Sequence, residues 1–403
     1  MIQRNLYLDF LIRLKDNEQI KVITGIRRSG KSFLLKQFRD YLLAKNIAKT
    51  SILYFNFESL QFADLTKGMA LYKYLLKNCQ SAVEKIYFLF DEIQEVENWQ
   101  KIVNSLRVDF DCDIYLTGSN ASLLSGELAT YLTGRTVRLE MQPLTYQEYL
   151  VFKGIDPEAV KFDSGSITDY IRFGGFPAVV LSEDEQIKEN ILYEISENII
   201  FRDVAIRGGI TDIDVLRRVI KFLLDNIGQP ISLTKIVNTL QSAHIKTTAK
   251  TVSRILTLLE NAYIFKACNR FDILGKGQLS TTPKYYAADT GLRNQLLGIF
   301  SGNLGGQLEN IVYNELNRRS YEIYTGRAGT KEIDFVAVRN GLTTYIQVTY
   351  QLPENTHETD NLLAVRDGYR KIVITQNWED IGIVDGIRVI HISDFLLKDL
   401  EML

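Results

Sequence analysis

Eight residues near the N-terminus have the types and spacing of a phosphate-binding loop. The stretch from Gly25 to Ser32 reads GIRRSGKS and fits the pattern G-x-x-x-x-G-K-S. Its glycines let backbone N–H groups curl around an anion without side-chain clash. Lys31 would reach the β- and γ-phosphates of a nucleoside triphosphate, and the Ser32 hydroxyl would bind Mg²⁺. The expected nucleotide site comprises Gly25, Ile26, Arg27, Arg28, Ser29, Gly30, Lys31, Ser32 and Phe33.

The neighbours of this loop have the pattern that the signature requires. The apolar run Lys21–Thr24 predicts a strand before the loop, and Phe33–Phe38 predicts an amphipathic helix after it. The N-terminus of that helix would add partial positive charge to the phosphate pocket. Arg27 and Arg28 occupy unconstrained positions, where they either contact phosphate or are merely hydrated, and we favour hydration.

Two carboxylates follow a second apolar run. The sequence IYFLFDE is typical of a buried central strand that delivers Asp91 and Glu92 at its tip. Asp91 would hold Mg²⁺, generally through water, and Glu92 would polarise the water that attacks the γ-phosphate. A strand that simply ends in solvent is the alternative, but the preceding phosphate loop favours the catalytic interpretation. Asn120, after the run DIYLTGS, would orient the same water, and a compatible role for Ser119 or Asn120 is to cap the next helix.

A sheet must position these residues. Strand-like runs alternate with helix-like segments over residues 1–150. Such alternation predicts an α/β domain with parallel strands and crossover helices, and ligands then gather at the carboxyl ends of the strands. The predicted strands are Lys21–Thr24, Ser51–Glu58, Ile86–Glu92, Asp113–Asn120 and Thr136–Glu140.

The order of these parts resembles that of AAA-type ATPases of the additional-strand P-loop class: phosphate loop, acidic pair, then a polar residue called sensor 1. The resemblance implies ATP and Mg²⁺ as cofactors, and the absence of an N-K-x-D guanine signature favours ATP over GTP. In that class an arginine finger just before the fifth strand reaches the γ-phosphate of a neighbouring subunit. Arg135 in YLTGRTVRLE stands at that place, which would make the active form a homo-oligomer. An ordinary surface arginine is the alternative.

The whole chain is similar to bacterial and archaeal P-loop ATPases of comparable length that carry a C-terminal domain of unknown function. The resemblance rests on GIRRSGKS, FDEIQEVENW, LTGSNASLLS, LTGRTVRLEMQPLTYQEYL and FGGFPAVV. We divide the chain into an AAA-type ATP-binding domain at residues 1–150 and a helical lid or linker around GGFP at 151–210. A winged helix at 211–295 and a small α/β nuclease-like domain at 296–403 follow.

Residues 211–295 resemble a winged helix. Three helix-like segments, DIDVLRRVIKFLLDNIG, SLTKIVNTLQSA and TTAKTVSRILTLLENA, precede a predicted two-strand wing. In this helix-turn-helix variant the third helix can enter the DNA major groove. Basic residues are in local excess here, and the alternative is a protein-docking winged helix with a hydrated basic face. The expected DNA contacts are Lys246, Thr248, Lys250 and Arg254.

Residues 296–403 resemble the PD-(D/E)XK nuclease fold, in which a helix glutamate, an aspartate and a (D/E)-x-K strand converge on Mg²⁺. Glu309 matches the helix acid and Asp334 the aspartate, but the third element begins at Gln347 and ends at Thr349. Glutamine brings no charge and threonine cannot replace the ammonium group. Mg²⁺ would therefore bind weakly at best, and we expect no DNA cleavage.

The module would instead hold a substrate or dock a partner. We interpret Lys331 and Glu332, close to Asp334, as a hydrated pair. If the site needed a positive charge, Lys331 would be the first candidate to supply it.

Composition sets the remaining limits. A chain of 403 residues with 46% hydrophobic residues predicts about two to four folded domains. The net charge of −2 excludes a globally basic nucleic-acid binder, so a DNA contact must be local. Three scattered cysteines suit a reducing cytosol, and no apolar run approaches the roughly 20 residues that span a bilayer. We expect a cytoplasmic protein without membrane contact.

Two functions fit these observations. The favoured one is an ATP-driven switch or machine that acts on nucleic acid. The rival is a signalling or scaffold ATPase in which ATP sets assembly and the C-terminal modules bind an unidentified protein partner.

Overall fold

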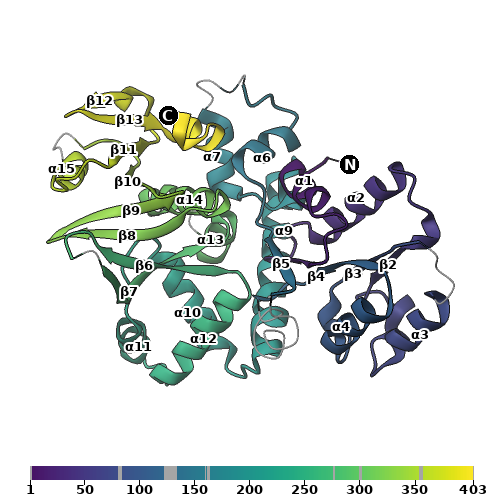
Figure 1. Ribbon diagram of the computed structural model, residues 1–403. Helices are drawn as coiled ribbons and strands as arrows, with labels where there is room; N and C mark the ends of the chain where they lie inside the picture. Colours follow the sequence, from purple (N-terminus) through teal and green to yellow (C-terminus); the bar gives the residue numbers. More distant parts are fainter. Residues whose placement is uncertain are drawn as a thin grey trace. The chain divides into compact units, whose positions relative to one another are not determined.

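A computed structural model describes residues 2–79, 84–121, 134–158, 160, 164–275, 277–298, 302–353 and 357–402. The chain forms two compact units, the first ending at Gln142 and the second beginning at Pro143. Figure 1 follows the chain through both of them. Within the ranges given, every helix is too short or too polar to cross a lipid bilayer.

The first unit is built on a five-stranded parallel sheet. Its strands lie in the order β2-β3-β4-β1-β5, so β4 separates the strand before the phosphate loop from the strand that ends in the acidic pair. The prediction of a parallel P-loop-type α/β domain is confirmed, because all five strands are parallel and each overlaps a predicted run, with β1 and β4 beginning one residue earlier than predicted. The bounds are β1 Ile20–Thr24, β2 Ile52–Asn56, β3 Ile86–Asp91, β4 Cys112–Thr117 and β5 Thr136–Glu140.

Helices cover both faces of this sheet (Figure 1). Neighbouring residues of a strand point to opposite faces. Tyr87 and Leu89 therefore pack against α1 and α2, whereas Phe88 and Phe90 pack against α3 and α4. Burial on both sides explains why β3 is apolar up to its last residue. These helices are α1 Asn5–Arg13, α2 Lys31–Ala44, α3 Ala70–Cys79 and α4 Trp99–Asp109.

The second unit begins with helices. After α9, which continues into a π-helical segment η5, three helices and an antiparallel hairpin follow in the order predicted for a winged helix. Asp212, Ser232 and Thr248 cap the three helices, since each side chain accepts a backbone N–H from the first turn. The bounds are α6 Tyr146–Phe152, α7 Ser164–Phe173, α8 Pro177–Val180, α9 Glu185–Asn198, η5 Ile199–Ile206, α10 Ile213–Asp225, α11 Leu233–Ser242, α12 Ala249–Asn261, β6 Phe265–Asp272, β7 Gly277–Ala287 and α13 Thr290–Leu297.

An eight-stranded mixed sheet, in the order β12-β13-β11-β10-β9-β8-β6-β7, completes the second unit. Residues Arg270 to Asp272 of β6 pair in parallel with Thr325 to Arg327 of β8. The hairpin β6–β7 is therefore the edge of this sheet rather than a free wing (Figure 1). The remaining bounds are α14 Leu304–Arg318, β8 Glu322–Ala328, β9 Lys331–Arg339, β10 Leu342–Thr349, α15 His357–Leu363, β11 Arg370–Thr375, β12 Gly382–Val384, β13 Ile387–His391 and α16 Ile392–Leu397.

Contacts join everything after Pro143 into a single compact unit. Our division of these residues into a lid, a winged helix and a nuclease-like domain stays a prediction.

The motif FGGFP has a packing role in the second unit. Gly175 donates its N–H to Asp289 Oδ2 at 2.7 Å. A Cβ on Gly174, whose φ is +72°, would stand 1.9 Å from the other oxygen of Asp289, so glycine is required there. Burial raises the pKa of Asp289 to about 6, and the backbone N–H groups that it accepts oppose this shift. The motif thereby fixes the end of α7 against the start of α13.

Candidate functional site

The phosphate loop connects β1 to α2 through backbone that favours glycine at two positions. Gly25 has a φ of +135°, and a Cβ there would lie 2.0 Å from the carbonyl oxygen of Met141. Gly30 has a φ of +103° and is the N-cap of α2. No side chain in the described part of the chain caps this helix end. A helix N-terminus without a side-chain cap is where an anion binds favourably.

Lys31 lies inside the loop. Its side chain is buried, and Nζ donates to two carbonyl oxygens of the loop, each at 3.0 Å. Arg4, just before α1, grips the loop from outside: Nη1 donates to the carbonyl oxygens of Ser29 at 2.9 Å and Gln142 at 2.8 Å. Sequence reasoning missed Arg4, because no local pattern connects it with a loop so far along the chain.

Asp91 collects three hydroxyl groups at the end of β3. Oδ1 accepts from Ser32 Oγ at 3.0 Å and from Thr117 Oγ1 at 2.5 Å, and Oδ2 accepts from the Tyr54 hydroxyl at 3.0 Å. Burial raises the pKa of Asp91, and the three hydrogen bonds oppose that effect. The structure thus brings together Ser32 and Asp91, the two residues predicted to hold Mg²⁺. Tyr54 and Thr117 were not predicted.

Glu92 stands where the chain turns sharply after β3, with a φ of +55°. Its backbone N–H donates to Thr117 Oγ1 at 2.9 Å, and Gln94 Nε2 donates to its carboxylate. Asn120 follows β4 and is buried. The strand β4 lies between β1 and β3 and is parallel to both. Asn120 is therefore at the carboxyl ends of the strands, as are the phosphate loop and the acidic pair.

The other loop residues lie around this centre. Ile26 is buried, whereas Arg28 is exposed and has a φ of +67°. Arg27 Nη2 pairs with Glu58 Oε1 at 2.7 Å. Phe33 is 57% exposed although it is in the first turn of α2, so it adds little to the core.

Arg135 lies at the amino ends of the strands, whereas the phosphate loop and the acidic pair lie at their carboxyl ends. It directly precedes β5, whose first residue Thr136 pairs with Ile20 at the start of β1, whereas the phosphate loop follows Thr24 at the end of β1. The structure therefore does not bring Arg135 to the chain's own nucleotide site. Arg138 comes closer, since its Nε donates to Thr24 Oγ1 at 3.2 Å.

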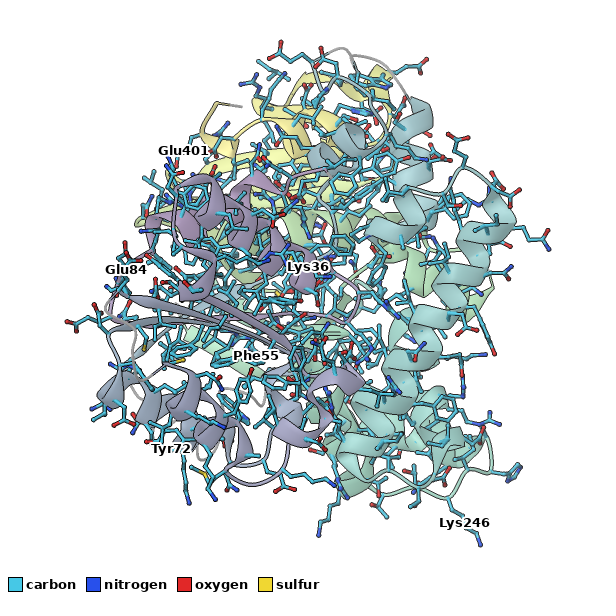
Figure 2. The ribbon with its side chains drawn as sticks, turned by 90° about the vertical axis from the view of Figure 1, so that its right-hand side faces the viewer. Lys36, Phe55, Tyr72, Glu84, Lys246 and Glu401 are labelled. Atoms are coloured by element: carbon cyan, nitrogen blue, oxygen red, sulfur yellow. The ribbon has the colours of Figure 1, made fainter. Side chains whose placement is uncertain are left out.

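The residues predicted to contact DNA lie just before α12 and in its first two turns. Lys246, Thr248 and Lys250 are exposed, and Figure 2 shows Lys246 pointing away from the protein at the lower right. Thr248 is the N-cap of α12, because its Oγ1 accepts a backbone N–H three residues on, at 3.2 Å. Arg254 donates to the carbonyl oxygen of Gly208, which ties this guanidinium to the segment before α10.

The three residues of the nuclease-like site do lie together, around a lysine that sequence reasoning missed. Lys284 of β7 is 1% exposed, and its Nζ lies 2.8 Å from Glu309 Oε1, 2.9 Å from Glu332 Oε1 and 3.4 Å from Asp334 Oδ1. Gln347 Oε1 accepts the N–H of Asp334 at 3.4 Å. We call Lys284, Glu309, Glu332 and Asp334 the lysine–carboxylate cluster.

This cluster corrects two expectations. Glu332 is not part of a hydrated pair with Lys331, because its carboxylate contacts Lys284 and lies 3.7 Å from Arg270 Nη2. The positive charge beside Asp334 comes from Lys284 rather than Lys331. Burial alone would lower the pKa of Lys284, but the three carboxylates raise it above its ordinary value. No set of three or more His, Cys, Asp or Glu side chains in the described ranges is arranged to hold a metal ion.

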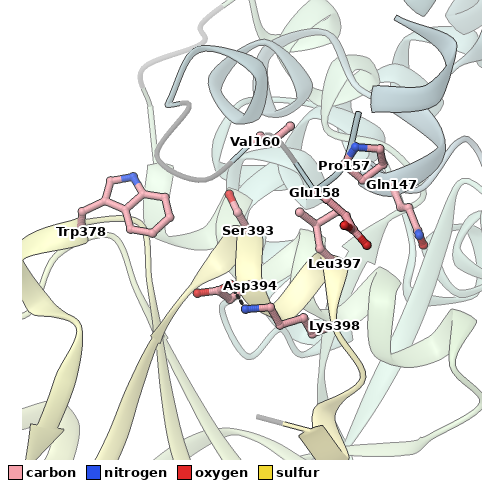
Figure 3. A pocket seen from close by; sticks show the side chains of 9 residues that line it. All are labelled: Gln147, Pro157, Glu158, Val160, Trp378, Ser393, Asp394, Leu397 and Lys398. Carbon is pink, nitrogen blue, oxygen red and sulfur yellow. Dashed lines mark hydrogen bonds and ion pairs between the residues drawn. The ribbon is translucent and has the colours of Figure 1, made fainter. Parts of the chain in front are cut away.

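One cavity of the second unit, of about 500 Å³, contains none of the predicted site residues in its wall (Figure 3). Trp378 stacks on His391 with ring centroids 3.5 Å apart, and Lys398 Nζ donates to Asp394 Oδ1 at 2.6 Å. The residues that line the cavity are Gln147, Pro157, Glu158, Val160, Trp378, Ser393, Asp394, Leu397 and Lys398.

Known proteins match the chain along its whole length. An AAA domain matches residues 17–150, and a domain of unknown function (DUF8612) matches residues 164–303. A Haemophilus influenzae protein described as uncharacterized is 48% identical over 398 residues, 99% of each chain. A Methanocaldococcus jannaschii protein, also described as uncharacterized, is 33% identical over 366 residues, 87% of this chain and 79% of that one. The structure of a Walker-type ATPase from Pyrococcus abyssi is similar over 73% of this chain and 96% of its own chain, with 14% sequence identity and a TM-score of 0.42.

Proposed function

This chain belongs to the family of AAA-domain proteins that includes the Haemophilus influenzae and Methanocaldococcus jannaschii relatives, and from that premise we propose that its first unit binds ATP with Mg²⁺ and hydrolyses it. The observation that carries the proposal is the 3.0 Å hydrogen bond from Ser32 Oγ to Asp91 Oδ1. It joins the end of the phosphate loop to the end of the acid strand. The two groups offer adjacent hard oxygen atoms, which Mg²⁺ prefers as ligands.

The remaining residues of the site have matching roles in this proposal. Lys31 would exchange its two loop carbonyls for phosphate oxygens. Mg²⁺, when bound with the nucleotide, neutralises the charge that develops on the transferred phosphoryl group. Glu92 would orient the attacking water and accept its proton, and Asn120 would hold the same water from the neighbouring strand end. Gln94 and Thr117 support the placement of Glu92.

We further propose that ATP turnover is coupled to DNA binding in a homo-oligomer. The exposed lysines Lys246 and Lys250 at the start of α12 support contact with the phosphate backbone. The position of Arg135, remote from its own nucleotide site, supports a role at the site of a neighbouring subunit. The rival function is an ATP-dependent scaffold that binds protein through the same surfaces.

ATP turnover with and without duplex DNA tests the proposal. Wild-type protein is expected to hydrolyse ATP, and Glu92→Gln is expected to bind Mg-ATP while turnover falls by about 10² or more. If Glu92→Gln turned over ATP as fast as the wild type, Glu92 would not be the residue that activates the water. A wild type without turnover contradicts the ATPase proposal itself.

A gel-shift series at increasing salt then separates the two rival functions. DNA bound through phosphate contacts dissociates steeply with salt, whereas a protein scaffold gives no DNA band at any salt concentration. The double variant Lys246→Ala/Lys250→Ala should weaken the band and leave basal turnover intact. The matched control is Lys73→Ala/Lys77→Ala, which removes the same charge from exposed positions of α3.

A further inference from the structure

The lysine–carboxylate cluster surrounds one ammonium group with three carboxylates. Lys284 comes from β7, Glu309 from α14, and Glu332 and Asp334 from β9. An ammonium group has three N–H donors and no acceptor. Lys284 Nζ donates to Glu309 and Asp334, and Glu332 forms a further ion pair with it. The carboxylates have further partners: the Tyr286 hydroxyl donates to Glu309 Oε1 at 2.6 Å, and the backbone N–H of Val348 donates to Asp334 Oδ2 at 2.9 Å.

Backbone from the turn between α10 and α11 closes over this cluster. A Cβ on Gly228, whose φ is +79°, would stand 2.5 Å from Glu309 Oε2. Pro230 forms an isolated bridge with Lys284, and the N–H of Ile231 donates to the carbonyl oxygen of Pro283 at 3.0 Å. These contacts explain why Lys284 is 1% exposed even though it lies in an edge strand.

The nuclease resemblance implies a divalent cation between Glu309, Asp334 and Gln347, and the residues present do not fit one. The Lys284 ammonium already contacts oxygens of both acids. The Gln347 amide oxygen accepts the N–H of Asp334. A divalent cation in this place would have to displace a fully buried lysine, since like charges at such short range repel strongly.

We propose that Lys284 is a resident cation that takes the place of a divalent metal in the cluster and fastens the hairpin β6–β7 to α14 and β9. The hairpin would thus be held to the rest of the sheet by charge as well as by the short pairing of β6 with β8. This inference is independent of ATP hydrolysis by the first unit. The proposal explains why Glu309 and Asp334 match the acids of the nuclease fold although Lys284 occupies the place of the metal ion.

Manganese binding tests the proposal, with Asp91→Asn present in every full-length protein so that the nucleotide site does not add to the signal. We expect electron paramagnetic resonance to detect no Mn²⁺ at the cluster while Lys284 is present. Lys284→Ala should bind one Mn²⁺ per chain, at least tenfold more than the Lys284 protein at the same Mn²⁺ concentration, because the buried carboxylates of Glu309 and Asp334 then lack the ammonium group. Adding Asp334→Asn to Lys284→Ala should abolish that gain. Lys266→Ala, which removes a lysine from β6, is the matched control and should gain no site.

Two results would overturn the proposal: Mn²⁺ bound at the cluster while Lys284 is present, or no gain in Lys284→Ala. If Lys284→Ala does not fold in the presence of a chelator, circular dichroism measures whether Mn²⁺ restores its helical signal. Restoration supports the proposal, and continued unfolding at millimolar Mn²⁺ contradicts it. Wild-type protein should also show no Mg²⁺-dependent nicking of DNA, and nicking that disappears in Asp334→Ala would show that a metal does bind beside Lys284.

Discussion

The hydroxyl group of Thr117 donates a hydrogen bond of 2.5 Å to Asp91 Oδ1. Thr117 Oγ1 also accepts the backbone N–H of Glu92 at 2.9 Å. A single side chain at the end of β4 therefore fixes the positions of both acids at the end of β3. This relationship depends on the sheet order, which places β4 beside β3.

Thr117→Val should separate positioning from nucleotide binding. Valine keeps the shape of threonine but leaves the buried N–H of Glu92 without this acceptor, which costs about 1–3 kcal/mol of folding free energy. We expect ATP turnover to fall at least tenfold while ATP affinity changes only a few-fold, because the phosphate loop is untouched. Urea unfolding and steady-state kinetics measure both effects. Thr117→Ser keeps the hydroxyl group and is the control; unchanged turnover in Thr117→Val would show that Thr117 does not position the acids.

Lys31→Ala should abolish ATP binding or nearly so, because the loop loses the point charge that meets the β- and γ-phosphates. Titration with a fluorescent ATP analogue measures the affinity. Lys36→Ala is the matched control, since Lys36 is on the same helix (Figure 2). Its Nζ lies 5.8 Å from the centroid of the Phe33 ring. Equal ATP affinity of Lys31→Ala and wild type would show that the phosphate loop does not bind the nucleotide through Lys31.

Arg135→Ala should lose turnover but recover it when mixed with Glu92→Gln. In a mixed oligomer, the intact nucleotide site of an Arg135→Ala subunit would receive the arginine of its Glu92→Gln neighbour. Mixing with the double variant Glu92→Gln/Arg135→Ala should give no recovery, because that neighbour supplies no arginine. Turnover of the mixtures at fixed total protein measures the effect. Full activity of Arg135→Ala alone would instead identify a surface arginine.

Asp289 should make the stability of the second unit depend on pH. Its folded-state pKa of about 6 exceeds the ordinary value of 3.8, so the folded state holds the proton more tightly. The stabilisation is complete below about pH 4 and is lost as the pH rises through 6. Two pKa units correspond to about 3 kcal/mol. The unfolding free energy of Asp289→Asn, relative to wild type, should therefore increase by up to about 3 kcal/mol between pH 4 and pH 7. A difference that stays constant over this range would show that Asp289 does not titrate as described.

The nucleotide site was largely predictable because its parts are local. A phosphate loop needs eight consecutive residues, and Asp91 and Glu92 end one apolar run, so chain order alone indicates where they lie. Tyr54 and Thr117 were missed for the opposite reason. Each is an ordinary strand residue, and its hydroxyl reaches Asp91 only because β2 and β4 both lie beside β3.

Lys284 shows the same limit more strongly. The nuclease resemblance directs the search for a positive charge to β10, two residues beyond Gln347. The charge comes instead from a hairpin that sequence reasoning assigned to a different module. Only the pairing of β6 with β8 brings that hairpin into the sheet, and no local pattern around either strand predicts a parallel pair across so many intervening residues.

The pairing of β6 with β8 also limits how the polypeptide can be shortened. A fragment that starts after residue 295 would leave β8 with an uncovered edge, and such edges recruit other chains and promote aggregation. The complementary fragment would leave β6 with an uncovered edge, because its partner β8 would be missing. Neither product would be suitable for binding studies, and the later fragment would hold Glu309 and Asp334 without the lysine that lies between them in the whole chain. Proteolysis within α13 should accordingly yield insoluble pieces rather than two folded ones.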